Sequence, residues 1–301
     1  MPEVDVAGCP LYYEVHGDGE PMVLLHGGQT DSSLMEDFAS MLPDFRALLF
    51  DQRGVGRSGK PDVPYTIPLI ANEVAALMRH LGFWPAHVLG VSMGEMVAQE
   101  LVLRHPDAVS DLVLGCTLHT APTQAIAQPS AQTGEPSPYT SEPITPAERA
   151  ITLSEVLFAP GFVSEHPEAV DRMIAMSEAQ LTDAVGLQRR LDAAYSWAGS
   201  RDRLGDIECP VLVMTGTQDQ IAATSISHEL ASNLPSAELV VLDPAGHGFW
   251  IEQPAATREA LMRFYARLKS AKGLMTSDAT RPAAPSSFAT PAAPTKGWGS
   301  Q

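Results

Sequence analysis

Six short apolar runs, separated by stretches with helical periodicity, constrain the fold of this 301-residue chain more than any other feature. The runs are MVLL (22–25), ALLF (47–50), HVLGV (87–91), DLVLGC (111–116), VLVMTG (211–216) and LVVLD (239–243). Continuous apolar runs of this length are typical of strands that are covered on both faces. An alternation at Leu11, Tyr13 and Val15 predicts one earlier strand, half exposed to water.

Helical periodicity occupies the gaps between the runs. Apolar residues recur every three to four positions between 67 and 81, and again between 261 and 268. A chain that alternates strands with helices forms a mostly parallel sheet joined by right-handed crossovers. We therefore predict an α/β fold with a doubly wound sheet.

The alternation stops between residues 119 and 208. Six prolines fall between 120 and 147, too many for a packed element, and they predict a loop or mobile flap. Helical spacing follows, with one apolar stripe between 170 and 181 and a second between 187 and 195. We interpret this stretch as a helical cap, inserted after the sixth strand, that would shape a pocket over the strand ends.

These patterns divide the chain into three parts. Residues 1–118 and 209–270 would form the sheet-containing core, and 119–208 the proline-rich loop with the helical cap. Residues 271–301 are rich in Ala, Pro, Ser and Thr and have too few large apolar side chains to order themselves. We predict that this last part is a disordered tail.

Charge and composition exclude several classes of function. The formal net charge of −17 would repel nucleic acids and anionic membrane surfaces, so neither is expected as a partner. No signal-like or membrane-spanning apolar stretch is visible, and a cytoplasmic location is expected. The three cysteines have no C-x-x-C spacing and the nine histidines no H-E-x-x-H pair, so no metal or cofactor is predicted. The oligomeric state stays open, a homodimer included.

The sequence GVSMG (90–94) stands between a predicted strand and a helical stretch. A G-x-S-x-G sequence in that context is typical of a nucleophile elbow, in which glycines leave room for a sharp turn. The following helix N-terminus would favour a developing alkoxide. We predict that Ser92 is a nucleophile, the alternative being a small residue that merely permits the turn.

A nucleophilic serine needs a general base and a carboxylate that orients it. Asp219 follows the run VLVMTG and His247 follows the run LVVLD. Because parallel strands bring their carboxyl ends to one edge, we predict that Ser92, Asp219 and His247 meet there. Asp243 is the alternative acid, whereas Asp111 begins a strand and would lie at the opposite edge.

Charge that develops on a substrate carbonyl also needs hydrogen-bond donors. The sequence HGGQTDS follows the run MVLL, and its Gly28 lacks a side chain that would keep the backbone away. We predict that the amides of Gly28 and Met93 form an oxyanion hole. His26, the neighbour of these glycines, would hold their loop by hydrogen bonds.

Four other polar or aromatic residues have expected roles. Asp51 and Arg53, in FDQRGVGRS, would pin a turn after the run ALLF rather than contact substrate. His119, at the start of the cap, and Trp250, three residues after His247, are candidates for lining a substrate pocket.

Five motifs together resemble one family. LLHGG, FDQRGVGRS, GVSMG, TGTQD and GHGFWIEQP occur in the order and spacing of an α/β-hydrolase of the lid-bearing, cofactor-independent branch, over about residues 3–270. Within that family, GVSMGEMVAQE is similar to enol-lactonases, polyketide methylesterases and carboxylesterases. The resemblance implies Ser92 as nucleophile, His247 as general base and Asp219 as its partner. Glu95 stands where the family usually has Gly or Ala, and a carboxylate facing the pocket would disfavour anionic substrates.

We therefore expect a serine hydrolase that cleaves a small ester or lactone through an acyl-enzyme. Two alternatives remain open from the sequence. One is a cofactor-free haloperoxidase or perhydrolase that uses the same triad. The other is a ligand-binding receptor or pseudoenzyme that keeps the pocket but turns over slowly.

Overall fold

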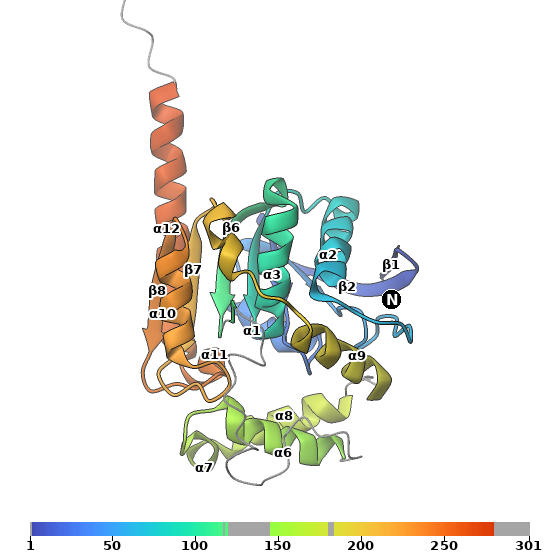
Figure 1. Cartoon of the computed structure of the whole chain (residues 1–301). Helices are drawn as coiled ribbons and strands as arrows, with labels where there is room; N and C mark the ends of the chain where they lie inside the picture. Colours follow the sequence, from blue (N-terminus) through green and yellow to red (C-terminus); the bar gives the residue numbers. More distant parts are fainter. Residues whose placement is uncertain (1, 117, 120–144, 180–183, 280–301) are drawn as a thin grey trace, which may run out of the picture. The chain divides into compact units, whose positions relative to one another are not determined.

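A computed structural model describes residues 2–116, 118–119, 145–179 and 184–279 (Figure 1). The chain forms two compact units, Met1–Met262 and Arg263–Gln301. The sheet and the cap both lie in the first unit. The predicted proline-rich loop falls mainly outside the described residues, and the predicted domain limits remain predictions.

Eight strands form one sheet in the order β1-β2-β4-β3-β5-β6-β7-β8. They are β1 (Glu3–Val6), β2 (Cys9–His16), β3 (Glu20–Leu25), β4 (Phe45–Phe50), β5 (Ala86–Val91), β6 (Val109–Gly115), β7 (Val211–Gly216) and β8 (Ala237–Leu242). The pairs β1–β2 and β2–β4 are antiparallel, and all other pairs are parallel. Each of the six apolar runs lies on one of the strands β3 to β8, which confirms the predicted mostly parallel sheet.

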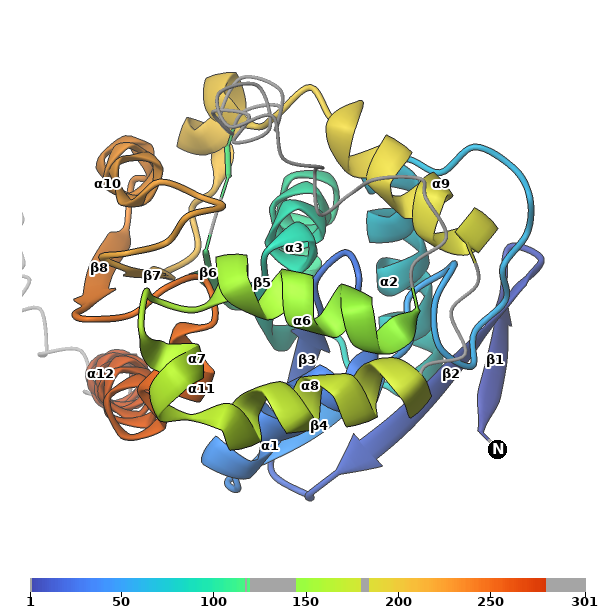
Figure 2. The same cartoon turned by 90° about the horizontal axis from the view of Figure 1, so that it is seen from below.

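Helices cover both faces of the sheet (Figure 2). They include α1 (Glu36–Met41), α2 (Ile67–Leu81), α3 (Met93–Arg104) and α10 (Thr224–Asn233). Two further helices, α11 (Phe249–Glu252) and α12 (Pro254–Ala279), follow β8 in the chain. Helices α2, α3 and α10 lie on one face and α1 on the other. Helix α2 begins where Thr66 accepts a hydrogen bond from the Leu69 amide, and it ends at Gly82 in the left-handed conformation, with φ of 71°.

The central strands are covered as the continuous apolar runs predict. Every residue of β5 and of β7 is buried. The earlier strand, β2, is partly exposed: Leu11 is buried, but Val15 near the other end is 44% exposed. Helix α3 is buried from Met93 to Val102 because the sheet lies on one side and α2 packs on another.

The cap follows β6 and lies at the carboxyl edge of the sheet (Figures 1 and 2). Its helices are α6 (Pro146–Leu157), α7 (Phe162–Glu165), α8 (Pro167–Ala179) and α9 (Ala184–Tyr195). Helix α6 begins within the stretch expected to be a loop, because Thr145 and Glu148 form a reciprocal capping box around its first turn. The described part of the cap therefore contains two helices, α6 and α7, that the apolar stripes do not indicate.

Helix α12 continues past residue 271, where the predicted tail begins, to Ala279. The predicted limit of the tail remains a prediction. The rest of the predicted tail lies outside the described residues. No helix in the described ranges combines the length and the apolar character that crossing a bilayer requires.

Candidate active site

Ser92 occupies a strained turn between β5 and α3. Its backbone angles, φ of 53° and ψ of −126°, are ones that non-glycine residues rarely adopt. A Cβ added at Gly94 would lie 2.1 Å from the Leu25 carbonyl oxygen, and one at Gly90 would lie 2.5 Å from the Gly94 carbonyl oxygen. The close approach predicted for both glycines is confirmed. The Ser92 hydroxyl makes no capping hydrogen bond to α3, so it remains available for chemistry.

His247 and Asp219 form a buried pair on the loops that follow β8 and β7. The His247 Nδ1 atom lies 3.0 and 2.9 Å from the two carboxylate oxygens of Asp219. The Asp219 Oδ1 atom also accepts hydrogen bonds from the amides of Ile221 and Ala222, each 2.8 Å long. Because Nδ1 donates to the carboxylate, Nε2 is the nitrogen that is free to accept a proton.

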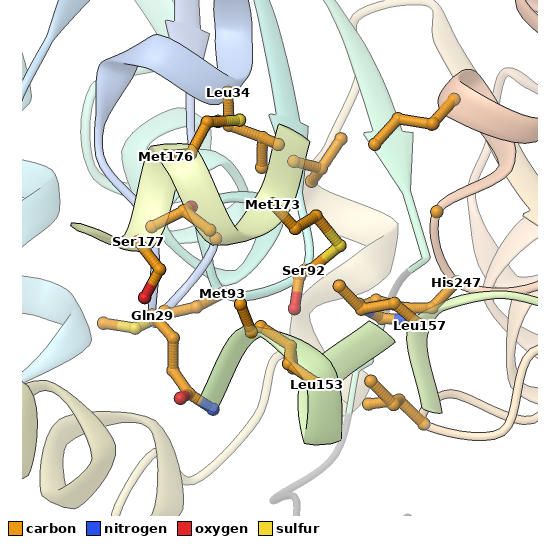
Figure 3. Close-up of a pocket in the computed structure, with 18 of the residues that line it drawn as sticks. Gln29, Leu34, Ser92, Met93, Leu153, Leu157, Met173, Met176, Ser177 and His247 are labelled. Atoms are coloured by element: carbon orange, nitrogen blue, oxygen red, sulfur yellow. The ribbon is translucent and has the colours of Figure 1, made fainter. Parts of the chain in front are cut away.

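Ser92 and His247 line one cavity beneath the cap (Figure 3). The structure contains no hydrogen bond between them, since His247 Nε2 is buried without a hydrogen-bond partner in the described part of the chain. Catalytic hydrogen bonds are commonly long or misaligned before substrate binds. The structure thus joins two of the three predicted triad residues and brings the third to the same cavity.

The predicted oxyanion residues lie next to each other. A Cβ placed on Gly28 would lie 3.6 Å from the Met93 Cβ, and one on Gly27 would lie 3.5 Å from the Ser92 Cβ. Gly28 and Met93 both line the cavity that contains Ser92. The Met93 amide directly follows Ser92 in the chain, and Gly28 directly follows Gly27, whose added Cβ would lie 3.9 Å from the Ser92 Oγ atom.

Hydrogen bonds hold the loop after β3 that contains Gly27 and Gly28, called the glycine loop below. The Gln52 amide donates to His26 Nε2 over 3.1 Å, so the other ring nitrogen, Nδ1, donates to the Gly27 carbonyl over 2.9 Å. Burial, followed by the positive charge of Arg190, lowers the pKa of His26 to about 3. His26 is therefore a neutral residue that holds the loop, as expected from its position.

The cavity is small and mostly apolar. Its volume is about 160 Å³, and a cavity of roughly 150 Å³ holds a molecule the size of benzene. The cap contributes Leu153 and Leu157 from α6 and Met173 and Met176 from α8 (Figure 3). Flexible methionine side chains adapt to ligands of different shape. The arrangement suits a small apolar group held beside a hydroxyl.

The two predicted pocket residues have different locations. Trp250 lines the cavity. His119 does not, because Leu118 faces the cavity and the next side chain points elsewhere. His119 is 1% exposed, and its Nε2 atom lies 3.5 Å from a carboxylate oxygen of Glu229.

Glu95 does not face the cavity. Its side chain is fully buried and accepts a 2.7 Å hydrogen bond from the Leu118 amide, which holds the chain just after β6. Gln99, one turn further along α3, also donates to this carboxylate. The unusual acid at this position therefore gives no reason to exclude anionic substrates.

The other acids considered from the sequence lie away from His247. Asp243 is exposed and accepts a 2.6 Å hydrogen bond from the Thr217 hydroxyl. Asp111 pairs with His87 at 2.6 Å. Asp51 accepts hydrogen bonds from the amides of Ser32 and Arg57, which pins the turn after β4 as predicted.

Arg53 forms a buried ion pair with Glu73 of α2, with Nε 2.9 Å from one carboxylate oxygen. Neither side chain lines the cavity. The pair ties the same turn to the helix layer, in agreement with the structural role expected for Arg53.

Cys116, Asp219 and His247 bring three potential metal-ligand atoms within 4.8 Å of one another. Their chemistry does not suit a metal. The His247 and Asp219 atoms already bond each other, and the Cys116 thiol donates to the His247 carbonyl over 2.7 Å. Burial and the nearby carboxylates raise the pKa of Cys116 well above its ordinary value, so it remains a neutral thiol rather than a thiolate ligand.

Two residues around the site escape sequence reasoning. Glu252 accepts hydrogen bonds from the Gly246 amide (2.7 Å) and the Ala159 amide (2.9 Å), which ties the histidine loop to the cap. Arg190, in α9, is fully buried against the glycine loop. The sequence contains one indication that Arg190 is buried. It falls at helical spacing on the same face as Leu187, Leu191 and Ala194, and a charged side chain on an apolar face is buried with that face.

Comparisons with known proteins agree with this fold. Residues 20–138 match the family model described as "alpha/beta hydrolase fold". The chain is 26% identical over 265 residues to "Putative carbamate hydrolase RutD" of Azorhizobium caulinodans, with 88% of this chain and 98% of that protein covered. It is 28% identical over 264 residues to "Putative non-heme bromoperoxidase BpoC" of Mycobacterium tuberculosis, with 86% and 99% covered. The enol-lactonase structure from Burkholderia xenovorans LB400 has a TM-score of 0.74 at 25% identity, with 88% and 100% covered.

A mostly parallel eight-stranded sheet, with a helical cap over the strand ends and a serine in a strained strand-to-helix turn, defines a class of enzymes. The chain has the α/β-hydrolase fold and is an enzyme of the hydrolase class.

Proposed function

We propose that this chain is a serine hydrolase that cleaves a carboxylic ester or lactone, with Ser92, His247 and Asp219 as its catalytic triad. The observation that carries the proposal is the buried hydrogen bond of His247 to Asp219 beside the cavity that Ser92 also lines. In this arrangement the carboxylate fixes the imidazole in the tautomer that can accept the serine proton.

The proposed reaction has two halves. Ser92 Oγ attacks the substrate carbonyl carbon while His247 Nε2 takes the hydroxyl proton, and the amides of Gly28 and Met93 stabilise the resulting oxyanion. Collapse of this intermediate breaks the bond to the alcohol, which receives the proton from His247, and leaves Ser92 acylated. Water, deprotonated by His247, then releases the acid and restores the hydroxyl. Each oxyanion donor would contribute about 3 kcal/mol of barrier lowering.

The proposed substrate is a small ester or lactone with an apolar group. This is supported by the cavity of about 160 Å³ and its leucine and methionine lining. The printed names of similar proteins include an enol-lactonase and a carbamate hydrolase. Both names describe attack on a carbonyl carbon that bears an oxygen or nitrogen leaving group, and a carbamate therefore belongs among the substrates to be tested.

The test is hydrolysis of p-nitrophenyl esters graded from acetate to octanoate, with wild type and Ser92→Ala side by side. We expect Ser92→Ala to lower kcat by about 10⁶, and short acyl chains to be preferred. The exposed Ser40, whose hydroxyl donates to the Asp37 carbonyl, supplies the control Ser40→Ala with unchanged turnover. Wild-type activity in the Ser92 variant would refute the proposal.

A second reaction uses the same groups. The relative named non-heme bromoperoxidase suggests that hydrogen peroxide could replace water in the second half, so that the acyl-enzyme yields a peracid that then oxidises bromide. Bromination measured with acetate and peroxide, compared with ester turnover, separates the two activities. The remaining alternative is a ligand-binding receptor or pseudoenzyme that turns over slowly. Multiple turnovers on an activated ester, together with fast labelling of Ser92 by a fluorophosphonate, would exclude it.

A further inference from the structure

We propose that Arg190 of the cap is a positioning residue for the oxyanion hole: it holds the Gly27–Gly28 peptide so that the Gly28 N–H faces the substrate carbonyl. This inference rests on the proposed function, because it concerns the same serine-based reaction. It assigns to the cap a part in catalysis besides shaping the pocket.

The Arg190 guanidinium is bound to the glycine loop and the neighbouring turn by four hydrogen bonds. Its Nη2 atom donates to the Gly27 carbonyl and its Nε atom to the Gly28 carbonyl, each over 3.0 Å. Its Nη1 atom donates to the Arg53 carbonyl over 3.2 Å and to Gln52 Oε1 over 3.4 Å. All three nitrogens are therefore used, and two of them grip consecutive carbonyl groups of the predicted oxyanion loop.

Because the peptide group is planar, hydrogen bonds to the Gly27 carbonyl also fix the direction of the Gly28 N–H. The Gly27 carbonyl and the Gly28 N–H belong to one planar trans peptide group, so they point in opposite directions. Donors at the Gly27 oxygen, from His26 and from Arg190, hold the Gly28 N–H toward the other side. Ser92 lies close to this peptide: a Cβ on Gly27 would lie 3.9 Å from the Ser92 Oγ atom.

Two consecutive glycines would otherwise leave this peptide free to rotate, because glycine adopts backbone conformations that other residues do not. A hydrogen bond to the carbonyl also polarises the peptide group and strengthens its N–H as a donor. Arg190 thus contributes both the direction of the donor and its strength.

Burial of the Arg190 side chain carries a desolvation cost that no ion pair in the described ranges offsets. Arg190 is completely buried, and no carboxylate in the described ranges forms an ion pair with it. Burial lowers the pKa of Arg190 to about 10, which leaves the group charged near neutral pH. The atoms that accept its hydrogen bonds are neutral carbonyl oxygens, and the nearby Asp51 carboxylate acts on the guanidinium electrostatically without a direct ion pair.

The neighbouring arginine supplies a matched control. Arg189 is on the same helix but pairs with Asp62 at 2.7 Å, partly exposed and away from the cavity. Arg189→Met removes the same kind of side chain from α9 without disturbing the glycine loop. A general weakening of the cap would affect both variants, whereas misplacement of the oxyanion donor would affect only the Arg190 variant.

The experiment compares Arg190→Met, Arg190→Lys and Arg189→Met with wild type. It measures kcat and KM on the best ester, and Ki for a trifluoromethyl ketone with the same acyl group, which forms a tetrahedral oxyanion adduct on the serine. We expect Arg190→Met to lower kcat by roughly 10- to 100-fold with KM nearly unchanged. The Ki should rise by the same factor, and Arg190→Lys should fall between, because a lysine cannot span both carbonyls.

Unchanged kcat and Ki in Arg190→Met, or a loss confined to KM, would overturn the inference. If Arg190→Met does not fold, as a thermal melt would show, Arg190→Lys decides by the same criteria. Failure of the proposed function looks different: Ser92→Ala would then remain active, whereas failure of this inference alone leaves Ser92→Ala inactive and Arg190→Met active.

Discussion

The sheet edge that carries the proposed triad and the cap above it are packed very differently. Helix α3, which begins at the nucleophile turn, is buried over most of its length, whereas α7 and α8 of the cap contain no buried residue. The histidine and aspartate are fixed by short hydrogen bonds, but the cap side of the cavity consists largely of leucine and methionine side chains.

This difference teaches where each property of the enzyme is determined. Groups that must stay within hydrogen-bond reach lie on the tightly packed edge, and adaptable side chains surround the substrate. The cap is nevertheless joined to that edge by several hydrogen bonds, one of which is that of the Ala159 amide to Glu252. The Gly248 amide donates to the Leu157 carbonyl over 2.7 Å, and Arg190 binds the glycine loop.

Among the following variants, the largest effect is expected when Asp219, the carboxylate that bonds His247, is replaced. Asp219→Asn should lower kcat by about 10⁴ with KM little changed, because an amide would favour the wrong tautomer of His247. Steady-state kinetics on an activated ester measures it. Asp243→Asn, which alters the exposed acid considered as the alternative partner of His247, should retain wild-type kcat. Loss of activity in Asp243→Asn instead would assign the acid role to the other residue.

The nucleophile turn should tolerate no added carbon. Gly94→Ala would place a Cβ 2.1 Å from the Leu25 carbonyl oxygen, so β3 or α3 must shift. We expect a loss of about 1–3 kcal/mol in the free energy of unfolding, measured by urea denaturation, together with lower kcat. Gly205→Ala, where an added Cβ meets nothing within 4 Å, is the control and should have near wild-type stability. Equal stability of the two variants would contradict the proposed crowding of the turn.

His26, beside the glycine loop, should make the free energy of unfolding fall at acidic pH. Burial and Arg190 lower the pKa of His26 to about 3, so between pH 6.5 and 3 the unfolded chain binds a proton that the folded protein excludes. His26 therefore stabilises the fold above pH 6.5 and loses that contribution as the pH falls. From pH 6 to 4, the free energy of unfolding of wild type should fall more steeply than that of His26→Asn, by at most about 1.4 kcal/mol per pH unit. Equal slopes in urea denaturation at several pH values would contradict this.

The smallest effect is expected in the cap. Met173→Ala should enlarge the cavity and shift the preferred acyl chain to greater length, with less than about tenfold change in kcat/KM on the best short ester. The graded ester series measures this. Ile174→Ala, on the same helix but outside the cavity lining, should leave the chain-length profile unchanged. A large loss of kcat in Met173→Ala would mean that the cap contributes more to chemistry than the comparison of the two regions suggests.

Much of the sheet is predictable from the sequence because its strands are continuous apolar runs. The run VLVMTG coincides with β7, and the run HVLGV lies within β5. The order of loops along the chain also predicts that Asp219 and His247 share one edge, since parallel strands leave no other arrangement. Close packing at Gly90 and Gly94 follows from the same turn.

The cap is less predictable because its contacts are long-range. A charged side chain on a helix is expected to face water, and only the three-dimensional structure shows that Arg190 reaches two carbonyls more than 160 residues earlier in the chain. The direction of Glu95 is equally hidden, because a buried acid is acceptable only where an amide such as that of Leu118 meets it. His119 shows the converse: its place at the start of the cap says nothing about which way its ring turns.

The whole excursion of chain that builds the cap leaves from β6 and returns to β7, and these two strands are hydrogen-bonded neighbours, with Leu112 paired to Val211. Caps of other lengths could therefore be grafted between them without disturbing the strand register, since doubling a connection costs only about 0.6 kcal/mol in closure entropy. Any graft would still have to keep a guanidinium on the two glycine carbonyls and a chain segment that bonds the Gly248 amide and the Glu252 carboxylate. Exchange of specificity in this scaffold, by evolution or by design, is thus modular except at these contacts.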